Sequence, residues 1–389
     1  MTVNLGGIIV TNRFIPYGKQ WIDEDDIQAV VEVLKSDYLT TGPTVKEFEE
    51  KFAEYVGAKY AVAVSNGTAA LHAASFAAGI KEGDEVITTP LTFAASANCI
   101  LYQNGVPVFA DVDPDTYNIN PEEIRKKITS KTKAIIPVHF TGQPCDIDEI
   151  HQIAREYNLI VIEDAAHALG ARYRGKKIGG LSDMSIFSFH PVKHITTGEG
   201  GMITTNSKEL YNKLIQFRSH GITKNEDNYI NESHGSWYHE QQFLGYNYRM
   251  TDIQAALGVS QLNKSDNFLE RRREIAQIYN QELKDIEWIK LPYQESERES
   301  SWHLYIVQID EKKLDKSRRE VFDYLRKEGL GVQIHYIPVY WHPYYEKLGY
   351  NKKLCEVAER IYIKAISLPI YPKMDDIDID RVIKVLSSI

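Results

Sequence analysis

The segment SIFSFHPVKHITTGEGGMITTN, which runs from Ser185 to Asn206, decides how we interpret this chain. It begins with the alternation of a strand and passes through GEGG, a turn of small residues. A single lysine, Lys193, lies between these two parts, in a stretch too irregular for a long helix. A lysine near a strand end is usually a solvated surface residue. Its neighbours in the fold therefore decide whether Lys193 has a chemical role.

Short β-rich runs alternate with helical patterns from about residue 23 to about residue 251. The apolar runs, such as YAVAVS, VPVFADV, KAIIPVHF and LIVIEDA, are nearly continuous. Such runs are typical of strands that are buried on both faces of a parallel sheet. The clearest helical patterns between them cover residues 23–36, 66–79 and 94–105, and residues 165–170 are also helix-like. This alternation predicts an α/β fold with a mainly parallel central sheet and right-handed crossovers.

The chain has 389 residues, which is more than one compact core usually holds, so we expect two domains. The pattern changes near residue 251, where residues 251–283 form one long predicted helix that would connect the two parts. A smaller α+β pattern follows. We therefore expect a large domain with an N-terminal arm over residues 1–250, and the connecting helix with a small C-terminal domain over residues 251–389.

Composition excludes several functional classes. The net charge is −9 and no basic stripe is present, which disfavours nucleic acid as a partner. No apolar run approaches the ~18 residues of a membrane span, and the N-terminal stretch lacks the features of a signal peptide. The three cysteines are far apart, as expected for a reducing compartment. These observations predict a cytoplasmic protein without a membrane anchor.

A metal site is not expected. His190 and His194 have the i, i+4 spacing of a ligand pair, but Pro191 lies between them and no HExxH motif accompanies them. We therefore interpret them as structural or cofactor-site histidines. An aromatic run, HYIPVYWHPYY at residues 335–345, could line a pocket for a sugar or a uracil ring, or it could be a packed loop. The sequence leaves these two alternatives open.

Four predicted strand ends carry unusual residues, and ligands of open α/β sheets bind beyond the carboxyl ends of the strands. Each has a plain alternative: a helix N-cap, a core phenylalanine, a capping aspartate or structural ion pair, and a surface lysine. The four places are Ser65-Asn66-Gly67-Thr68, Thr92-Phe93, Glu163-Asp164, and Ser188 with Lys193. Together they offer a glycine-containing helix N-terminus for a phosphate, an aromatic ring, a carboxylate and an amine. These are the parts that a pyridoxal phosphate site requires.

Four motifs resemble one family. SNGTAALHAA, EDAAHALGA, SFHPVKHITTGEGG and LGYNYRMTDIQAALG are similar to motifs of the DegT/StrS-type sugar-nucleotide aminotransferases, which are fold-type I enzymes that use pyridoxal 5′-phosphate. The motifs occur in the order of the family, and the resemblance extends from about Pro16 to Pro372. It implies a large domain with a mainly parallel sheet and a smaller C-terminal α+β domain.

The resemblance also implies roles for particular residues. Lys193 would bond covalently to the cofactor aldehyde and later move a proton, and Asp164 would pair with the pyridinium nitrogen; these two are the implied catalytic residues. Many relatives have glutamine where this chain has His167, which would lie beside the ring. Asn247 would reach the cofactor phosphate of a partner subunit, so that a homodimer would share its active sites. The implied cofactor-binding residues are Gly67, Thr68, Phe93, Asp164, His167, Ser188, Lys193 and Asn247, and the implied substrate-binding residues are Thr41 and His335.

The stretch HPVKHITTGEGG further resembles the pseudaminic acid branch of this family. That branch uses L-glutamate to aminate the C4 keto group of UDP-2-acetamido-2,6-dideoxy-β-L-arabino-hexos-4-ulose. Other UDP- or dTDP-linked 4-keto-6-deoxy sugars are the alternative substrates. A related dehydratase would carry histidine at the position of Lys193, and a non-catalytic regulator would have lost Lys193 or Asp164. An NAD-dependent oxidoreductase is disfavoured because no GxGxxG follows a predicted strand.

Overall fold

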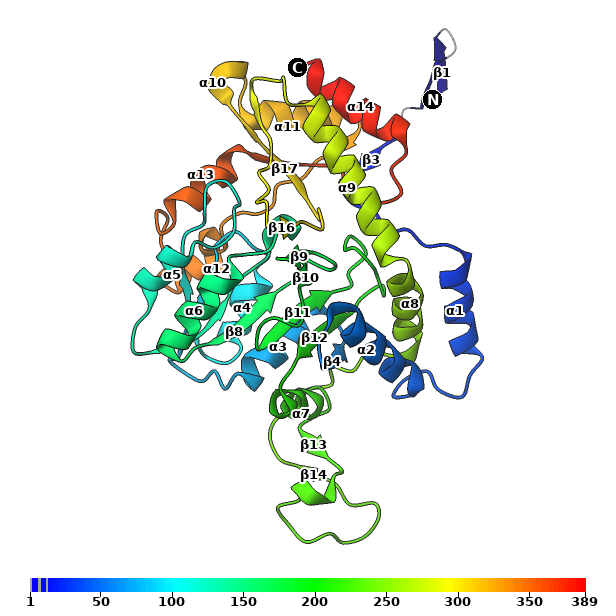
Figure 1. Cartoon of the computed structure of the whole chain (residues 1–389), viewed down its shortest axis with the longest axis vertical. Coiled ribbons are helices and arrows are strands. Elements are labelled where there is room, and N and C mark those ends of the chain that lie inside the picture. Colours follow the sequence, from blue (N-terminus) through cyan, green and yellow to red (C-terminus); the bar gives the residue numbers. More distant parts are fainter. Residues whose placement is uncertain (1, 6–7, 12) are drawn as a thin grey trace.

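The fold is known from a computed structural model that describes residues 2–5, 8–11 and 13–389 (Figure 1). In this part of the chain, seven strands form a central sheet in the order β4-β12-β11-β8-β7-β5-β6. The strands are β4 Tyr60–Val64, β5 Glu85–Thr88, β6 Val106–Phe109, β7 Thr132–Ile136, β8 Ile160–Asp164, β11 Met184–Ser188 and β12 Gly201–Thr205. All neighbours are parallel except β12, which is antiparallel to both β11 and β4. The predicted α/β fold with a mainly parallel sheet is confirmed.

Helices cover both faces of this sheet, which explains why its strands are apolar throughout. Strand β4 shows the principle: Ala61 and Ala63 pack with α2 on one face, whereas Val62 and Val64 pack with α3 on the other. The helices around the sheet are α2 Pro43–Val56, α3 Gly67–Ala77, α4 Ala95–Leu101, α5 Pro121–Lys127, α6 Ile147–Tyr157, α7 Lys208–Phe217 and α8 Asp252–Asn263.

The C-terminal part of the chain has a core of its own. Strands β15 Ile289–Lys290, β17 Tyr305–Ile309 and β19 Ala365–Leu368 form an antiparallel sheet. Helices α9 Ser265–Glu282, α11 Arg318–Lys327 and α14 Asp376–Ser387 supply residues to the same core cluster. Near the other end of the chain, β3 Ile15–Pro16 pairs with β18 Leu330–Gly331. The N-terminal segment therefore crosses to the C-terminal part, and the boundary at residue 250 stays a prediction.

Two local predictions were wrong. The expected single helix over residues 251–283 is two helices, α8 and α9, which are separated at Lys264, where φ is −102° and ψ is −4°. The ammonium group of Lys264 binds Asp23 and Asp26 at the start of α1 Glu24–Leu34, and Ser265 Oγ donates to the Leu262 carbonyl. The break thus depends on contacts that are distant in sequence.

The second wrong prediction concerns residues 165–170, which were expected to be helix-like. The chain forms successive turns here, in which Ala168 N donates to Ala165 O and Ala171 N donates to Ala168 O. Gly170 has a φ of +73°, and a Cβ at this position would lie 2.1 Å from Leu269 Cδ1. Close packing against α9 therefore favours a tight turn with glycine over a helix.

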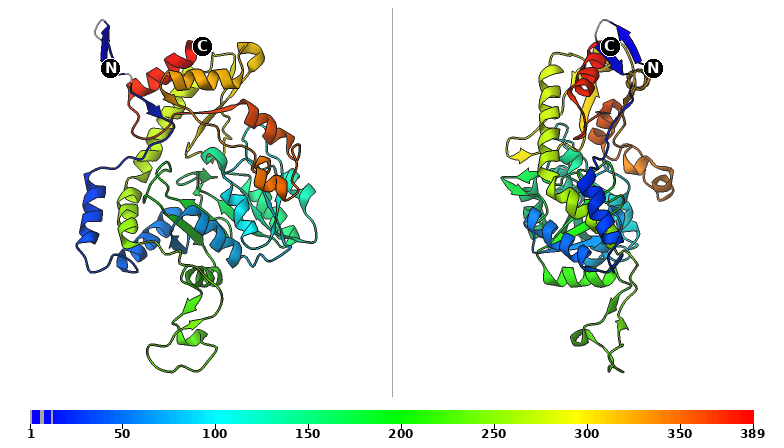
Figure 2. Two further views of the ribbon diagram at one scale, coloured as in Figure 1. Left: turned by 180° about the vertical axis from the view of Figure 1, so that it is seen from behind. Right: turned by 90° about the vertical axis from the view of Figure 1, so that its right-hand side faces the viewer.

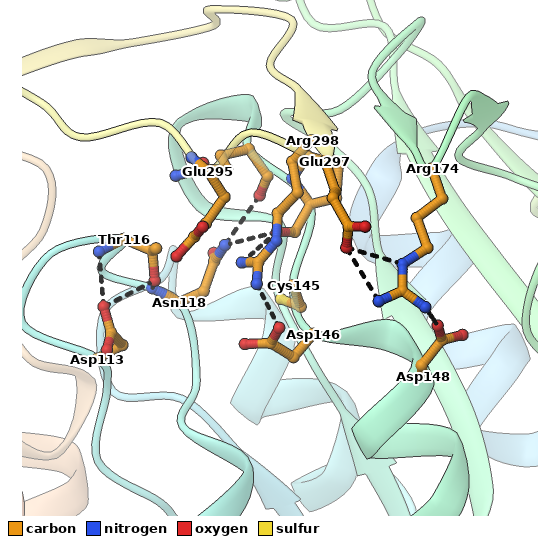
Figure 3. Close-up of polar contacts among 12 residues, drawn as sticks. Asp113, Thr116, Asn118, Cys145, Asp146, Asp148, Arg174, Glu295, Glu297 and Arg298 are labelled. Atoms are coloured by element: carbon orange, nitrogen blue, oxygen red, sulfur yellow. Dashed lines mark hydrogen bonds and ion pairs between the residues drawn. The ribbon is translucent and has the colours of Figure 1, made fainter.

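A polar seam joins the segment around β16 Arg298–Glu299 to loops of the central sheet (Figure 3). The guanidinium of Arg298 binds Asp146 and donates to the Pro144 carbonyl at 3.2 Å. Arg174 bridges Asp148 and Glu297 in the same way. The seam fixes the segment around β16 against the start of α6 and the turn at Arg174.

A long arm projects from the body of the molecule (Figures 1 and 2). It contains β13 Ile222–Thr223 and β14 Glu240–Gln241, which pair with each other. The Glu240 carboxylate accepts hydrogen bonds from the backbone N–H groups of Ile230 and Asn231, both at 2.7 Å, and these bonds lower the pKa of Glu240 to about 2. Its tip exposes 77% of Ile230 and 76% of Trp237.

None of the helices in the described chain is long and apolar enough to cross a membrane.

Candidate active site

A cavity of about 680 Å³ lies beyond the carboxyl ends of β4, β5, β8 and β11. This is where open α/β sheets bind ligands. The structure brings most of the predicted site residues to this cavity, although they are spread over nearly 270 residues of sequence. Its lining includes Gly67, Thr68, Phe93, Asp164, His167, Ser188, Lys193 and His335.

The helix N-terminus at one end of the cavity is built for an anion. The Asn66 side chain caps α3 by accepting from Ala69 N at 2.8 Å, so the plain N-cap alternative is correct as far as Asn66 is concerned. A Cβ on Gly67 would lie 3.0 Å from Ser188 Cβ, so glycine allows the loop to approach β11. Gly67 and Thr68 line the cavity at the positive end of the helix dipole.

Asp164 is a buried carboxylate at the end of β8, with 5% of its surface exposed. It accepts hydrogen bonds from Ser96 Oγ at 2.6 Å and Ala166 N at 3.1 Å, and no cation in the described residues forms an ion pair with it. The neighbouring Glu163 differs, because it is bound by His139 Nε2 at 3.0 Å. Glu163 is therefore the carboxylate that is held within the structure, and Asp164 remains free to meet a cation from outside the chain.

Lys193 follows the end of β11 and is partly buried in the same cavity. Loss of water lowers the pKa of its amine from 10.5 to about 8; Asp164 opposes this shift and the buried guanidinium of Arg272 assists it. At pH 7 about a tenth of the amine is therefore neutral, far more than in an ordinary lysine. A neutral amine is the form that attacks a carbonyl carbon.

This pKa gives the first testable prediction. Because the pKa is about 8, the neutral fraction of Lys193 should rise about tenfold between pH 7 and pH 9 and then level off. The initial rate at which the apoprotein takes up pyridoxal phosphate, measured by absorbance, should show the same tenfold rise and then level off. An ordinary lysine would give a rate that still rises steeply at pH 9, and such a profile would contradict the assignment.

Three more predicted residues line the cavity. Phe93 exposes 63% of its surface, so it is not a core residue, and its ring borders the cavity. His167 lies with its ring 4.2 Å from that of His303, and burial together with the charge of Lys193 holds the pKa of His167 well below its usual value. His335 accepts from or donates to Ser367 Oγ through Nδ1 at 2.7 Å, and burial lowers its pKa to about 3. Both imidazoles are therefore neutral.

Comparison with known proteins identifies the family. Residues 20–387 match the family described as the DegT/DnrJ/EryC1/StrS aminotransferases. The chain belongs to this DegT family of aminotransferases.

Individual relatives of the DegT family agree over nearly the whole chain. An uncharacterized protein of Methanocaldococcus jannaschii is 47% identical, over 98% of this chain and 99% of that protein. The UDP-4-amino-4,6-dideoxy-N-acetyl-beta-L-altrosamine transaminase of Campylobacter jejuni is 41% identical, over 93% of each. The structure of Helicobacter pylori PseC, an aminotransferase of pseudaminic acid biosynthesis, superposes with a TM-score of 0.89 at 32% identity, covering 97% and 99% of the two chains. A putative sugar aminotransferase of Streptococcus pneumoniae, in its PLP form, also gives 0.89 at 31% identity, covering 96% and 98%.

Two predicted residues of this DegT-family chain do not line the cavity. Thr41 is exposed, with a φ of +55°, and its hydroxyl donates to the Thr40 carbonyl at 2.7 Å. Asn247 is exposed at the base of the projecting arm, where it forms a backbone bridge with Ser219. A single chain therefore does not bring Thr41 or Asn247 to Lys193.

Sequence reasoning missed other residues of the cavity. Ser96, whose hydroxyl donates to Asp164, lies one helical turn after Phe93. Its position in the predicted helix, one turn from Phe93, could have indicated that it belongs to the site. Tyr336 follows the predicted His335 directly. Tyr17 arrives from the N-terminal segment through the pairing of β3 with β18, which no local pattern indicates. No group of three or more His, Cys, Asp or Glu side chains in the described part of this protein is arranged to hold a metal ion.

Proposed function

We propose that this chain is a pyridoxal-phosphate-dependent aminotransferase that transfers the amino group of L-glutamate to the C4 keto group of a nucleotide-linked 4-keto-6-deoxy sugar. One observation carries the proposal: a lysine with a lowered pKa, a buried carboxylate without a cation and a helix N-terminus face one cavity. Membership of the DegT family and the names of its sugar aminotransferases support it.

The cofactor is pyridoxal 5′-phosphate, and the residues present fit it. Asp164 is buried without a cation, and the close approach of Gly67 to Ser188 forms a cradle that a larger residue would fill. When bound, the cofactor supplies an aldehyde for an amine and a protonated ring that takes up electrons.

The chain's own residues have distinct tasks in this proposal. Backbone N–H groups at Gly67 and Thr68, with the hydroxyls of Thr68 and Ser188, bind the phosphate. Asp164 keeps the ring nitrogen protonated by accepting its hydrogen bond, and Ser96 fixes the direction of this carboxylate. Phe93 would cover the ring and His167 would lie beside it. Lys193 would hold the cofactor covalently and would carry a proton to or from the substrate carbon.

The finer assignment is to pseudaminic acid biosynthesis, with UDP-2-acetamido-2,6-dideoxy-β-L-arabino-hexos-4-ulose as the amino acceptor. The transaminase of Campylobacter jejuni and the PseC structure support this substrate. Another UDP- or dTDP-linked 4-keto-6-deoxy sugar is the alternative. The dehydratase and regulator alternatives have less support, because Lys193 and Asp164 are both present in the cavity.

An assay with a panel of substrates tests the proposal. The purified protein, loaded with pyridoxal phosphate, is incubated with L-glutamate and a set of UDP- and dTDP-linked 4-keto-6-deoxy sugars, and products are read by mass spectrometry. We expect the mass change of a ketone becoming an amine, with the UDP-linked 2-acetamido sugar as the preferred substrate. Failure to aminate any member, with Lys193 covalently loaded, would refute the proposed reaction.

We further propose that two copies form a cytoplasmic homodimer with shared active sites, in which Asn247 and Thr41 act at the cavity of the partner. The projecting arm supports this arrangement, since its base carries Asn247 and its tip exposes Ile230 and Trp237 to solvent in one chain. Large exposed apolar side chains on an ordered arm favour burial against another molecule.

Mixing two inactive variants tests the shared site. Lys193→Ala and Asn247→Ala homodimers should each have low activity. If Asn247 serves the partner's cavity, random re-association gives mixed dimers with one intact site each, and about a quarter of the wild-type activity should return. Measurement of transamination before and after dissociation and re-association shows the result. Should Asn247 act within its own chain, each mixed dimer would contain two defective sites and no activity would return.

A further inference from the structure

The sequence left open the role of the aromatic run at residues 335–345, and the structure gives its members different roles. The hydroxyl of Tyr340 donates to Glu359 Oε1 at 2.8 Å, and that of Tyr345 donates to Asn98 Oδ1 at 2.7 Å, so both are used within the packed protein. Tyr336 instead lines the cavity that holds Lys193. Most of the run is therefore a packed loop, and His335 and Tyr336 are its members that face the ligand space.

Tyr336 is held in place by aromatic neighbours. Its ring lies 6.3 Å from that of Phe93 in an edge-to-face arrangement and 6.1 Å from that of Phe140. Its hydroxyl lies 3.4 Å from His167 Nε2, and the structure of residues 13–389 gives this hydroxyl no other hydrogen-bond partner. Burial raises the pKa of Tyr336, so the phenol keeps its proton.

The direction of this hydrogen bond follows from the other nitrogen of His167. The imidazole is neutral, so it carries one proton, and its Nδ1 atom is buried without a partner. A buried N–H group without an acceptor is rarer and more costly than a buried acceptor without a donor. We therefore assign the proton to Nε2, which donates it to the Tyr336 oxygen. The hydroxyl proton of Tyr336 is then left to donate into the cavity.

The surroundings favour a neutral oxygen atom as the acceptor of this proton. A carboxylate ligand calls for a cation, and the rings in contact with Tyr336 are aromatic side chains and the neutral imidazoles of His167 and His335, while Lys193 of the same cavity is bonded to the cofactor in the proposed holoenzyme. A sugar, in contrast, offers hydroxyl, keto and amide oxygens without charge. Among the two substrates of the proposed reaction, the sugar fits this corner better than glutamate.

We infer that Tyr336 determines substrate specificity by donating a hydrogen bond to an oxygen of the sugar, and that His167 positions the hydroxyl through its Nε2–H. The inference rests on the proposed function, because that function supplies the sugar. It predicts that removal of the Tyr336 hydroxyl oxygen weakens recognition of the sugar and leaves recognition of glutamate unchanged.

Tyr336→Phe is the test, with Tyr340→Phe as the matched control from the same run. We expect Tyr336→Phe to weaken the calorimetric affinity of the holoenzyme for UDP-N-acetylglucosamine about tenfold, and to lower kcat/KM for the keto sugar by a similar or larger factor. The rate at which glutamate changes the absorbance of the bound cofactor should stay within about twofold of wild type. Tyr340→Phe should lower the melting temperature, because it removes the hydroxyl that donates to Glu359 and accepts from Cys355 N, and leave sugar binding unchanged.

Two results would overturn the inference alone. Unchanged sugar affinity in a correctly folded Tyr336→Phe holoenzyme would show that the hydroxyl does not contact the sugar. An equal loss in the glutamate reaction would show that Tyr336 acts on the cofactor site in general. If the wild-type protein responded to neither glutamate nor any nucleotide sugar, the proposed function and this inference would both fall.

Discussion

Replacing Lys193 with alanine is expected to lower transamination by more than ~10³-fold, the range lost with a positioned proton-transfer group, and to abolish covalent attachment of the cofactor. Lys193 is the amine in the cavity that faces Phe93, Asp164 and the N-terminus of α3. Borohydride reduction followed by mass spectrometry of peptides measures the attachment directly. The wild type should carry the reduced cofactor on the peptide that contains Lys193, and the variant should carry none.

Lys193→Arg is the matched control for charge. It keeps a long cationic side chain, but a guanidinium stays protonated and does not attack the aldehyde. We therefore expect Lys193→Arg to be as inactive as Lys193→Ala, while noncovalent binding of the cofactor through Gly67, Thr68 and Ser188 persists in both. Near-normal turnover in either variant would contradict the central role of this amine.

The sequence predicted those features that depend on local pattern. Strands such as β4 and β8 are buried on both faces, so their near-continuous apolar runs reveal a parallel sheet. Polar residues at the ends of these strands, among them Asp164, then share one edge of the sheet. The meeting of Asp164 and Lys193 in one cavity follows from this topology, although they are 29 positions apart in the sequence.

Features that depend on distant contacts were not predictable. The break between α8 and α9 arises where Lys264 binds Asp23 and Asp26, about 240 positions earlier. Phe93 has the same apolar side chain whether it lies in a core or, as here, on a cavity wall. The hydrogen bond between His167 Nε2 and the Tyr336 hydroxyl joins two segments 169 positions apart. In each case, the decisive partner belongs to another segment of the chain.

Asp164→Asn is expected to lower turnover by ~10²–10⁴-fold while the fold persists. Asparagine has the same shape and can still accept a hydrogen bond from Ser96 or Ala166, but it carries no charge to keep the ring nitrogen protonated. In the apoprotein, the change removes a buried carboxylate that has no cation among the described residues. The melting temperature of the apoprotein should therefore not fall, whereas the stabilisation gained on adding the cofactor should become smaller.

Glu163→Gln separates this electrostatic role from a general effect of neutralising a buried acid. Glu163 is adjacent in sequence and fully buried, yet it binds His139, Ser182 and Ser185, and it does not line the cavity. Its neutralisation weakens hydrogen bonds to a charged acceptor and should cost about 1–3 kcal/mol of stability, with turnover close to that of the wild type. Thermal unfolding and steady-state kinetics should therefore give opposite results for the two variants. Asp164→Asn should be stable and inactive, whereas Glu163→Gln should be less stable and active. If both variants lost activity in proportion to stability, the carboxylate of Asp164 would be a structural group, and its assignment as the partner of the cofactor ring would be wrong.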